Sequence, residues 1–139
     1  MPRTRVETRA RARVLQALYA WDLRSGESLD RVATQIWDDL SVPPDERKLA
    51  GGFVRTLSKH GDELDRDLAE VTTNWRLDRL AVIDRCVLRM AGAELHQGDT
   101  PPRVVIQEAV RLAERYGSVK SARFVNGVLD ALARRMGRL

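Results

Sequence analysis

The sequence is poor in the residues that stabilise a fold covalently or through metal. It contains one cysteine, Cys86, and two histidines, His60 and His96, among 139 residues. A single cysteine excludes a disulfide framework and any zinc site that needs several cysteines. Each histidine stands shortly before a glycine that is expected to end a helix, where an imidazole can cap the last carbonyls. We therefore expect no bound metal, and we interpret Cys86 as a small, half-buried hydrophobe.

Long apolar runs and alternating strand patterns are also missing. No run approaches the ~20 residues that span a bilayer, and the amino terminus lacks the apolar stretch of a signal peptide. The one strand-like run, residues 104–106, cannot form a sheet alone. Hydrophobic residues make up 43% of the chain, which is enough to bury a core. We expect a soluble, cytoplasmic protein whose residues 1–139 form a single domain.

Helical periodicity runs through most of the chain instead. Apolar residues recur at helical spacing in six segments, which are residues 10–21, 29–40, 45–61, 78–95, 101–113 and 125–136. The spacing continues beyond residue 61 to Val71, and Thr100-Pro101 is expected to cap and open the fifth segment. Glycines at the segment ends are expected to be left-handed, namely Gly26, Gly61, Gly98, Gly117 and Gly137. The prediction is an all-α fold of about six to seven helices.

A seam between two groups of helices is expected at Thr72-Thr73-Asn74. It separates the first three segments from the last three. The prediction is two small helical bundles that share one core. Apolar stripes on such helices serve a bundle or a dimer interface equally well, so the sequence leaves both a monomer and a homodimer open.

Charge is unevenly distributed along the chain. Residues 1–21 carry a net charge of +4, residues 22–70 carry −5, residues 71–102 are neutral and residues 103–139 carry +5. If the two basic ends meet in space, the surface steers an anionic partner to one side. One guanidinium group can donate two parallel hydrogen bonds to the oxygens of a phosphate. We therefore predict phosphate contacts for the amino-terminal arginines, which are Arg3, Arg5, Arg9, Arg11 and Arg13.

The sequence has no arrangement of side chains that supports catalysis. Adjacent acidic residues, such as Asp38-Asp39 and the group at 62–65, point to different faces of a helix and cannot converge on one reacting atom. We interpret them as solvated surface. The sequence has no glycine-rich phosphate loop and neither the HExxH nor the GxSxG motif. We expect neither an enzyme nor a cofactor.

The carboxy-terminal third suggests a second anion-binding region. Lys120, Arg123, Phe124 and Asn126 lie around the start of the sixth helix, where free backbone N–H groups favour anions. An aromatic ring beside two cations suits an unstacked base next to its phosphate. Phe124 is equally well explained as a core residue covered by a neighbouring tyrosine. Gly127 inside this helix implies close packing against its backbone.

Four stretches of sequence carry a resemblance to a known family. They are RARARVLQALYAW at residues 9–21, IDRCVLRMAGAEL at 83–95, VIQEAVRLA at 105–113 with Tyr116-Gly117 after it, and FVNGVLD at 124–130. In this order they resemble the NusB family of bacterial transcription antitermination factors. The resemblance covers nearly the whole chain, and the last stretch is its most specific element.

The resemblance implies two helical bundles without catalytic activity. It also implies binding of the boxA element of rRNA leader transcripts together with NusE, a small-subunit ribosomal protein, and loading onto RNA polymerase against Rho-dependent termination. The residues that match the family's RNA side are Arg9, Arg11, Arg13, Lys120, Arg123, Phe124 and Asn126. Those that match or flank its NusE side are Tyr19, Asp84, Arg85 and Arg89. Asp84 is expected to be an exposed carboxylate.

The chain departs from the family at some positions, and three other functions stay open. The family's run of arginines is interrupted by Glu7 and Thr8, and a loop position that is often acidic is Lys120 here. A DNA-binding helix-turn-helix would fit residues 107–129, although such motifs need an apolar residue where Arg123 stands. The others are a NusB-like domain of an rRNA methyltransferase and an all-helical scaffold that binds only protein.

Overall fold

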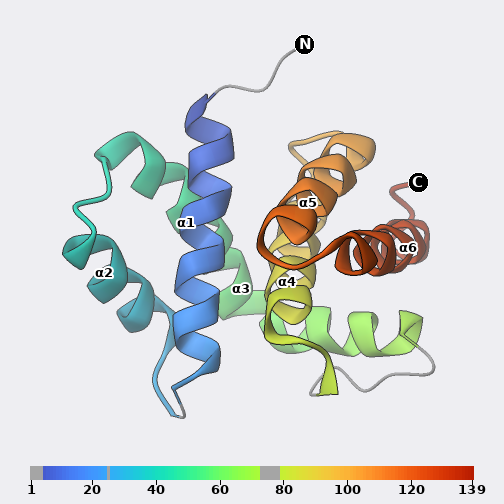
Figure 1. Cartoon of the computed structure of the whole chain (residues 1–139), viewed down its shortest axis with the longest axis horizontal. Helices are drawn as coiled ribbons and strands as arrows, with labels where there is room; N and C mark the ends of the chain where they lie inside the picture. The colour runs from blue at the N-terminus through green and yellow to red at the C-terminus, as the bar shows by residue number, and fades with distance from the viewer. Residues whose placement is uncertain (1–4, 25, 73–78) are drawn as a thin grey trace. The chain divides into compact units, whose positions relative to one another are not determined.

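The computed structural model describes residues 5–24, 26–72 and 79–139, and its regular structure within them is α-helical (Figure 1). The helices are α1 (Arg5–Asp22), α2 (Leu29–Asp39), α3 (Pro44–Val71), α4 (Val82–Gln97), α5 (Pro102–Tyr116) and α6 (Val119–Arg135). The all-α prediction is confirmed. None of the described helices has an apolar stretch long enough to cross a membrane.

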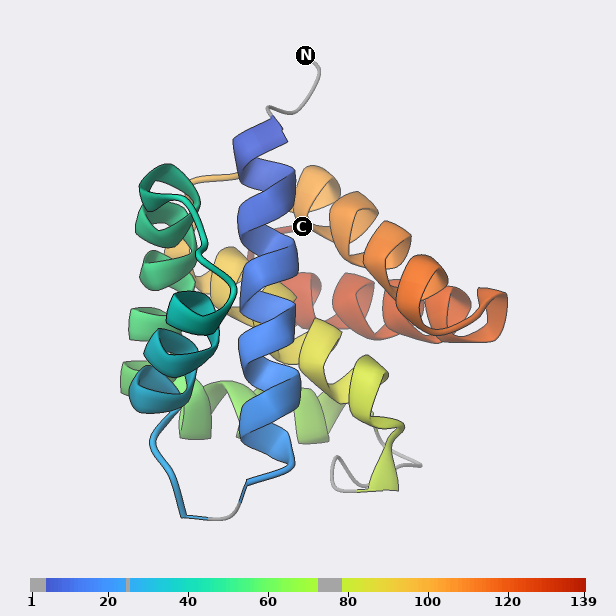
Figure 2. The ribbon, with the colours of Figure 1, turned by 60° about the vertical axis from the view of Figure 1, so that its left-hand side comes forward.

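The chain divides into two compact units, Met1–Lys59 and His60–Leu139. The first unit contains α1, α2 and the beginning of α3, and α1 packs against α2 (Figure 2). Its buried apolar residues follow the predicted spacing and include Val14, Leu18, Val32, Trp37 and Phe53. The Trp37 indole also donates a hydrogen bond of 3.1 Å to the Arg13 carbonyl. This bond ties the end of α2 to the middle of α1.

The second unit contains the rest of α3 together with α4, α5 and α6, and the last three pack against one another. Its fully buried side chains come from all four helices and include Leu64, Leu68, Leu88, Leu95, Val105, Leu129 and Leu132. Ser118 caps α6, because its hydroxyl accepts a 3.0 Å bond from the Ser121 N–H. Cys86 is completely buried rather than half-buried.

The predicted helix end at Gly61 is wrong, whereas the predicted seam at 72–74 stays a prediction. α3 continues through Gly61 to Val71, and the division between the units falls inside this helix. A glycine inside a helix costs about 1 kcal/mol, whereas burying a leucine contributes about 1.5–3 kcal/mol. Leu64 and Leu68, which follow the glycine, are at most 1% exposed, so their burial outweighs its cost. Thr73 and Asn74 lie outside the described residues.

Two further helix boundaries differ from the prediction. α4 begins at Val82, whereas Asp78, its predicted start, lies outside the described residues. α5 is capped by Pro101 and has Pro102 in its first turn, one residue later than predicted. Pro102 is tolerated at the first position of α5, because a backbone N–H there would have no hydrogen-bond partner within the helix.

The terminal glycines follow the prediction only in part. Three of them are left-handed, namely Gly26, Gly98 and Gly137. Gly117 follows α5 but has a φ of −117°. A Cβ there would lie 2.7 Å from the Ala113 carbonyl oxygen, so the position needs glycine for space and not for a left-handed φ.

Several polar residues take different roles from those predicted. His60 lies inside α3, not at a helix end, and its ring centroid is 4.3 Å from that of His96. Asp65 is not merely solvated surface, because it accepts two hydrogen bonds from Arg89, each of 3.1 Å. Asp38 stays exposed but pairs with Arg47 at 2.7 Å. Asp65 and Asp38, which the sequence pattern predicted to be solvated, are therefore paired with arginines in the folded chain.

Candidate functional site

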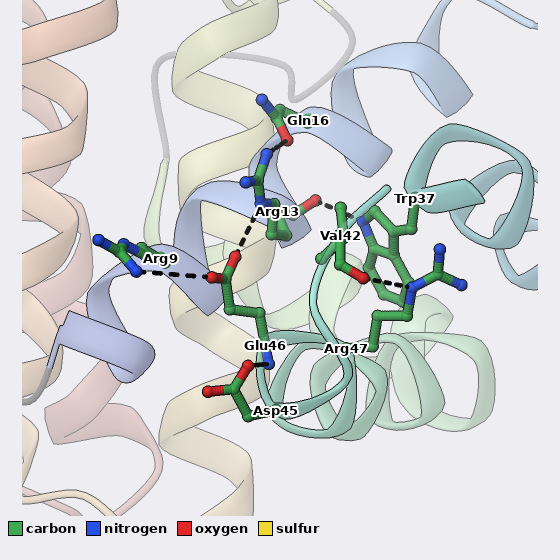
Figure 3. Close-up of polar contacts among 8 residues, drawn as sticks. All are labelled: Arg9, Arg13, Gln16, Trp37, Val42, Asp45, Glu46 and Arg47. Atoms are coloured by element: carbon green, nitrogen blue, oxygen red, sulfur yellow. Dashed lines mark hydrogen bonds and ion pairs between the residues drawn. The ribbon is translucent and has the colours of Figure 1, made fainter. Parts of the chain in front are cut away.

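A buried carboxylate organises the arginines of α1. Glu46 is 2% exposed, and its Oε1 accepts a 3.0 Å hydrogen bond from Nε of Arg13. Its Oε2 lies 3.9 Å from a guanidinium nitrogen of Arg9. Figure 3 shows both arginines extending from α1 toward this one side chain. The arginine-rich end is thus partly neutralised from within the first unit.

Local contacts fix this carboxylate in place. Glu46 lies in the first turn of α3, where an acidic residue complements the positive end of the helix. Its backbone N–H donates to Oδ1 of Asp45 at 2.9 Å. Arg13 is also held by Gln16, whose side-chain amide oxygen Oε1 accepts a 3.2 Å hydrogen bond from the Arg13 guanidinium group (Figure 3). Sequence reasoning missed Glu46, because an acidic first turn is common and its burial depends on α1.

The predicted phosphate contacts on α1 separate into three groups. Arg9 is largely exposed, at 57% of its side chain, and Arg13 is one-quarter exposed. Arg11 is only 3% exposed, so it is not a surface side chain, and its phosphate contact stays a prediction. A buried guanidinium cannot meet a phosphate without rearrangement of the residues around it. Arg3 and the Arg5 side chain lie outside what the structure describes.

The second unit presents its predicted residues on α6. Lys120, Arg123 and Asn126 are exposed, and Phe124 is half-buried. The tyrosine expected to cover Phe124, Tyr116, is itself 46% exposed and lies under the guanidinium carbon of Arg115 at 5.4 Å. A half-buried ring offers one edge or face to a ligand while the other side packs. The stacking and core explanations of Phe124 therefore both stay predictions.

A groove lies between α5 and α6 in this unit. Its volume is about 520 Å³, and Arg123 and Asn126 line it from α6. Arg103 and Gln107 line it from α5, and Ile106 belongs to its apolar part. The two α5 residues were not predicted as site residues. Their spacing of four along one helix was the available signal, since it places them on one face.

The residues matched to the NusE side differ in their exposure and in the hydrogen bonds that they make within the chain. Tyr19 is 42% exposed on α1. Asp84 is only 9% exposed, so the expectation of an exposed carboxylate is wrong, and its Oδ1 is buried without a hydrogen-bond partner in the described chain. Arg85 donates to the Leu80 carbonyl at 2.9 Å, and Arg89 is held by Asp65. These two arginines stabilise the start and middle of α4.

The chain resembles characterised proteins over most of its length. The model of the NusB family matches residues 8–134. The chain belongs to the NusB family. It is 48% identical over 129 residues to the transcription antitermination protein NusB of Anaeromyxobacter dehalogenans (strain 2CP-1 / ATCC BAA-258), covering 91% of this chain and 89% of that protein.

Solved structures of NusB proteins agree with this membership. NusB from T. maritima superposes with a TM-score of 0.82 at 32% identity, covering 96% of this chain and 93% of that one. A crystal structure of NusB and NusE in complex with dsRNA gives a TM-score of 0.85 at 30% identity, covering 96% of this chain and 99% of the matched chain. The predicted NusB resemblance is confirmed.

We expect the substitution Glu46→Gln to lower the free energy of unfolding by about 1–2 kcal/mol, since a hydrogen bond between charged groups contributes about 1.5–3 kcal/mol and the amide oxygen replaces part of it. Chemical denaturation measures the change. The matched control is Glu70→Gln on the exposed surface of α3, which should stay within about 0.5 kcal/mol of wild type. Equal stability of wild type and Glu46→Gln would mean that the pair with Arg13 does not stabilise α1 against α3.

Proposed function

We propose that this protein is a transcription antitermination factor that binds boxA RNA together with NusE. In this function it delivers the pair to RNA polymerase in the cytoplasm and suppresses Rho-dependent termination during rRNA synthesis. No catalytic step is involved. The observation that carries the proposal is the similarity, over nearly the whole chain, to the NusB that is bound to NusE and dsRNA.

Exposed cations in both units support RNA as the ligand. Arg9 in the first unit and Lys120 and Arg123 in the second lie on the surface. Within the part of the chain that the structure describes, none of the three has the short hydrogen bond to a carboxylate that holds Arg13 or Arg89. Guanidinium and ammonium groups of this kind exchange their hydration for phosphate oxygens. We therefore assign phosphate contact to Arg9, Lys120 and Arg123, with Asn126 beside them, and not to Arg11.

The other candidate functions have less support. An exposed Arg123 does not suit the apolar position of a helix-turn-helix. The similar protein of Anaeromyxobacter dehalogenans is a transcription antitermination protein and not a methyltransferase. A scaffold that binds only protein would leave the exposed cations of α6 without a role. A gel mobility shift with boxA RNA, duplex RNA and duplex DNA, each with and without NusE, distinguishes these functions.

RNA affinity should fall with salt concentration, because each phosphate contact releases counterions with a logarithmic slope of about −0.7 on single strands. Arg9→Ala should make the slope shallower by about 0.7, and the double variant Lys120→Ala, Arg123→Ala by about 1.4. The control is Arg66→Ala, an exposed arginine in the acidic part of α3. Fluorescence anisotropy at several salt concentrations gives the slopes. Slopes equal to wild type in both test variants would remove these residues from the phosphate contacts.

Substitution of Phe124 distinguishes its two explanations. If the ring stacks on a base, Phe124→Ala should weaken RNA binding by about 1–3 kcal/mol with little change in melting temperature. If it is a core residue, the loss appears as about 3–5 kcal/mol of stability. Because the ring is half-buried, we expect the larger effect on binding. Melting and RNA titration of the same purified variant decide the question, and a large loss of stability with unchanged affinity would contradict the stacking role.

Tyr19 is the best-placed residue for contact with NusE, because it is a large aromatic side chain that the first unit leaves 42% exposed. Tyr19→Ala should weaken NusE binding by about 1–2 kcal/mol, as exposed tyrosines often do when they anchor an interface. Leu40→Ala removes another exposed side chain of the same unit, 49% exposed, and serves as the control. Titration calorimetry with NusE gives both affinities. Identical affinities for the two variants would place the interface elsewhere.

A further inference from the structure

Gly127 is a glycine in the middle of α6 for which the fold has no apparent need. It is exposed, and a Cβ atom at this position would meet nothing within 4 Å. Its φ is not left-handed, unlike that of Gly26, Gly98 and Gly137. Glycine destabilises a helix interior relative to alanine. The expected close packing against the backbone of Gly127 is therefore not supplied by the described residues of the chain.

A second glycine within a helix of the same unit, Gly92, is explained by packing inside the protein. Gly92 of α4 is buried, and a Cβ there would lie 3.7 Å from Cδ2 of Leu132 and 3.9 Å from Cδ2 of Leu64. Two other helices thus pack over that position. Nothing comparable covers Gly127, so any group that approaches its backbone must come from outside the described chain.

The neighbours of Gly127 indicate what that group is. Arg123 and Phe124 precede it by four and three residues and share its side of the helix, and Lys120 lies a further turn back. A side chain at position 127 would lean toward the amino terminus and cover the surface between Arg123 and Phe124. Glycine keeps this surface open between two cations and a half-buried ring.

We propose that the sugar–phosphate backbone of the bound RNA crosses α6 directly over Gly127. Without a Cβ, a ribose or phosphate oxygen can come within van der Waals distance of the helix backbone and accept weak Cα–H contacts. The phosphates of that strand then lie within reach of Arg123 and Lys120. The inference rests on the proposed RNA binding and adds to it the place where the strand lies on the second unit.

The test uses the full-length protein and three variants. Gly127→Ala and Gly127→Gln fill the open surface to different extents, and both residues favour a helix. Gly61→Ala is the matched control, because Gly61 is also inside a helix with nothing within 4 Å but is followed by Asp62 and Glu63. Melting temperature, affinity for a boxA RNA oligonucleotide and affinity for NusE are measured for each protein.

We expect Gly127→Ala and Gly61→Ala each to raise the melting temperature by about 2–5 °C. Gly127→Ala should weaken RNA binding about tenfold, as an extra methyl group does in a close-packed site. Gly127→Gln should weaken it further. Gly61→Ala should bind RNA as the wild type does, and NusE affinity should not change in any variant.

Four results would overturn the inference. Wild-type RNA affinity in both Gly127 variants would show that no strand lies there. An equal loss in Gly61→Ala would assign the effect to helix stiffening. A loss of NusE binding with RNA binding intact would make Gly127 part of the protein interface. If the wild type itself fails to bind boxA RNA, the proposed function fails first, and that result is visible before any variant is compared.

Discussion

In each unit, carboxylates of α3 pair with arginines from other helices. In the first unit, Glu46 binds Arg13 of α1 at 3.0 Å. In the second unit, Asp65 binds Arg89 of α4 at 3.1 Å and Asp67 binds Arg135 of α6 at 3.2 Å. Partly buried pairs of this kind are costly to break from one side, because the remaining charge is left unpaired.

Because of these ion pairs, the charge pattern of the sequence does not give the charge on the surface of the folded chain. The sequence has an acidic middle between two basic ends, which suggests two oppositely charged faces. In the folded chain, part of the acidic middle and part of both basic ends neutralise each other inside the units. What is left on the surface is a smaller set of cations, including Arg9, Lys120 and Arg123. We therefore expect RNA binding to depend on the cations that stay exposed, and not on the total number of arginines; of these, Arg9 approaches Glu46 only to 3.9 Å.

Periodicity in the sequence was sufficient to predict the fold class and most helices, because apolar residues such as Val14 and Leu18 must be buried on one face. It was not sufficient at Gly61, where the free energy gained by burying Leu64 and Leu68 exceeds the cost of a glycine inside the helix. The burial of Glu46 could not be predicted, since it lies against α1, far away in sequence. The pattern also did not show that Arg11 is buried. For Gly127 a close neighbour was expected, and the described chain supplies none.

The family resemblance supplied the residues of the candidate site, and the structure separates them further. Lys120, Arg123 and Asn126 stay on the surface, whereas Arg11 and Asp84 are buried. Arg85 and Arg89 match positions that flank the NusE side but make bonds within the second unit. A matched position therefore identifies a candidate, and only its surroundings show whether the side chain is available to a partner.

We propose that Arg13 and Arg89, whose Nε–H groups donate hydrogen bonds to carboxylates of α3, are structural, and that the more exposed Arg9 and Arg123 contact RNA. NMR spectra that resolve the Nε–H groups of individual arginine side chains test it directly. Without RNA, the Nε–H signals of Arg13 and Arg89 should exchange slowly with water, because both groups are hydrogen-bonded to carboxylates. On addition of boxA RNA, the signals of Arg9 and Arg123 should shift while that of Arg89 stays unchanged. Rapid exchange of Arg13 and Arg89 in the free protein, or an RNA-induced shift of Arg89 as large as that of Arg123, would contradict the account.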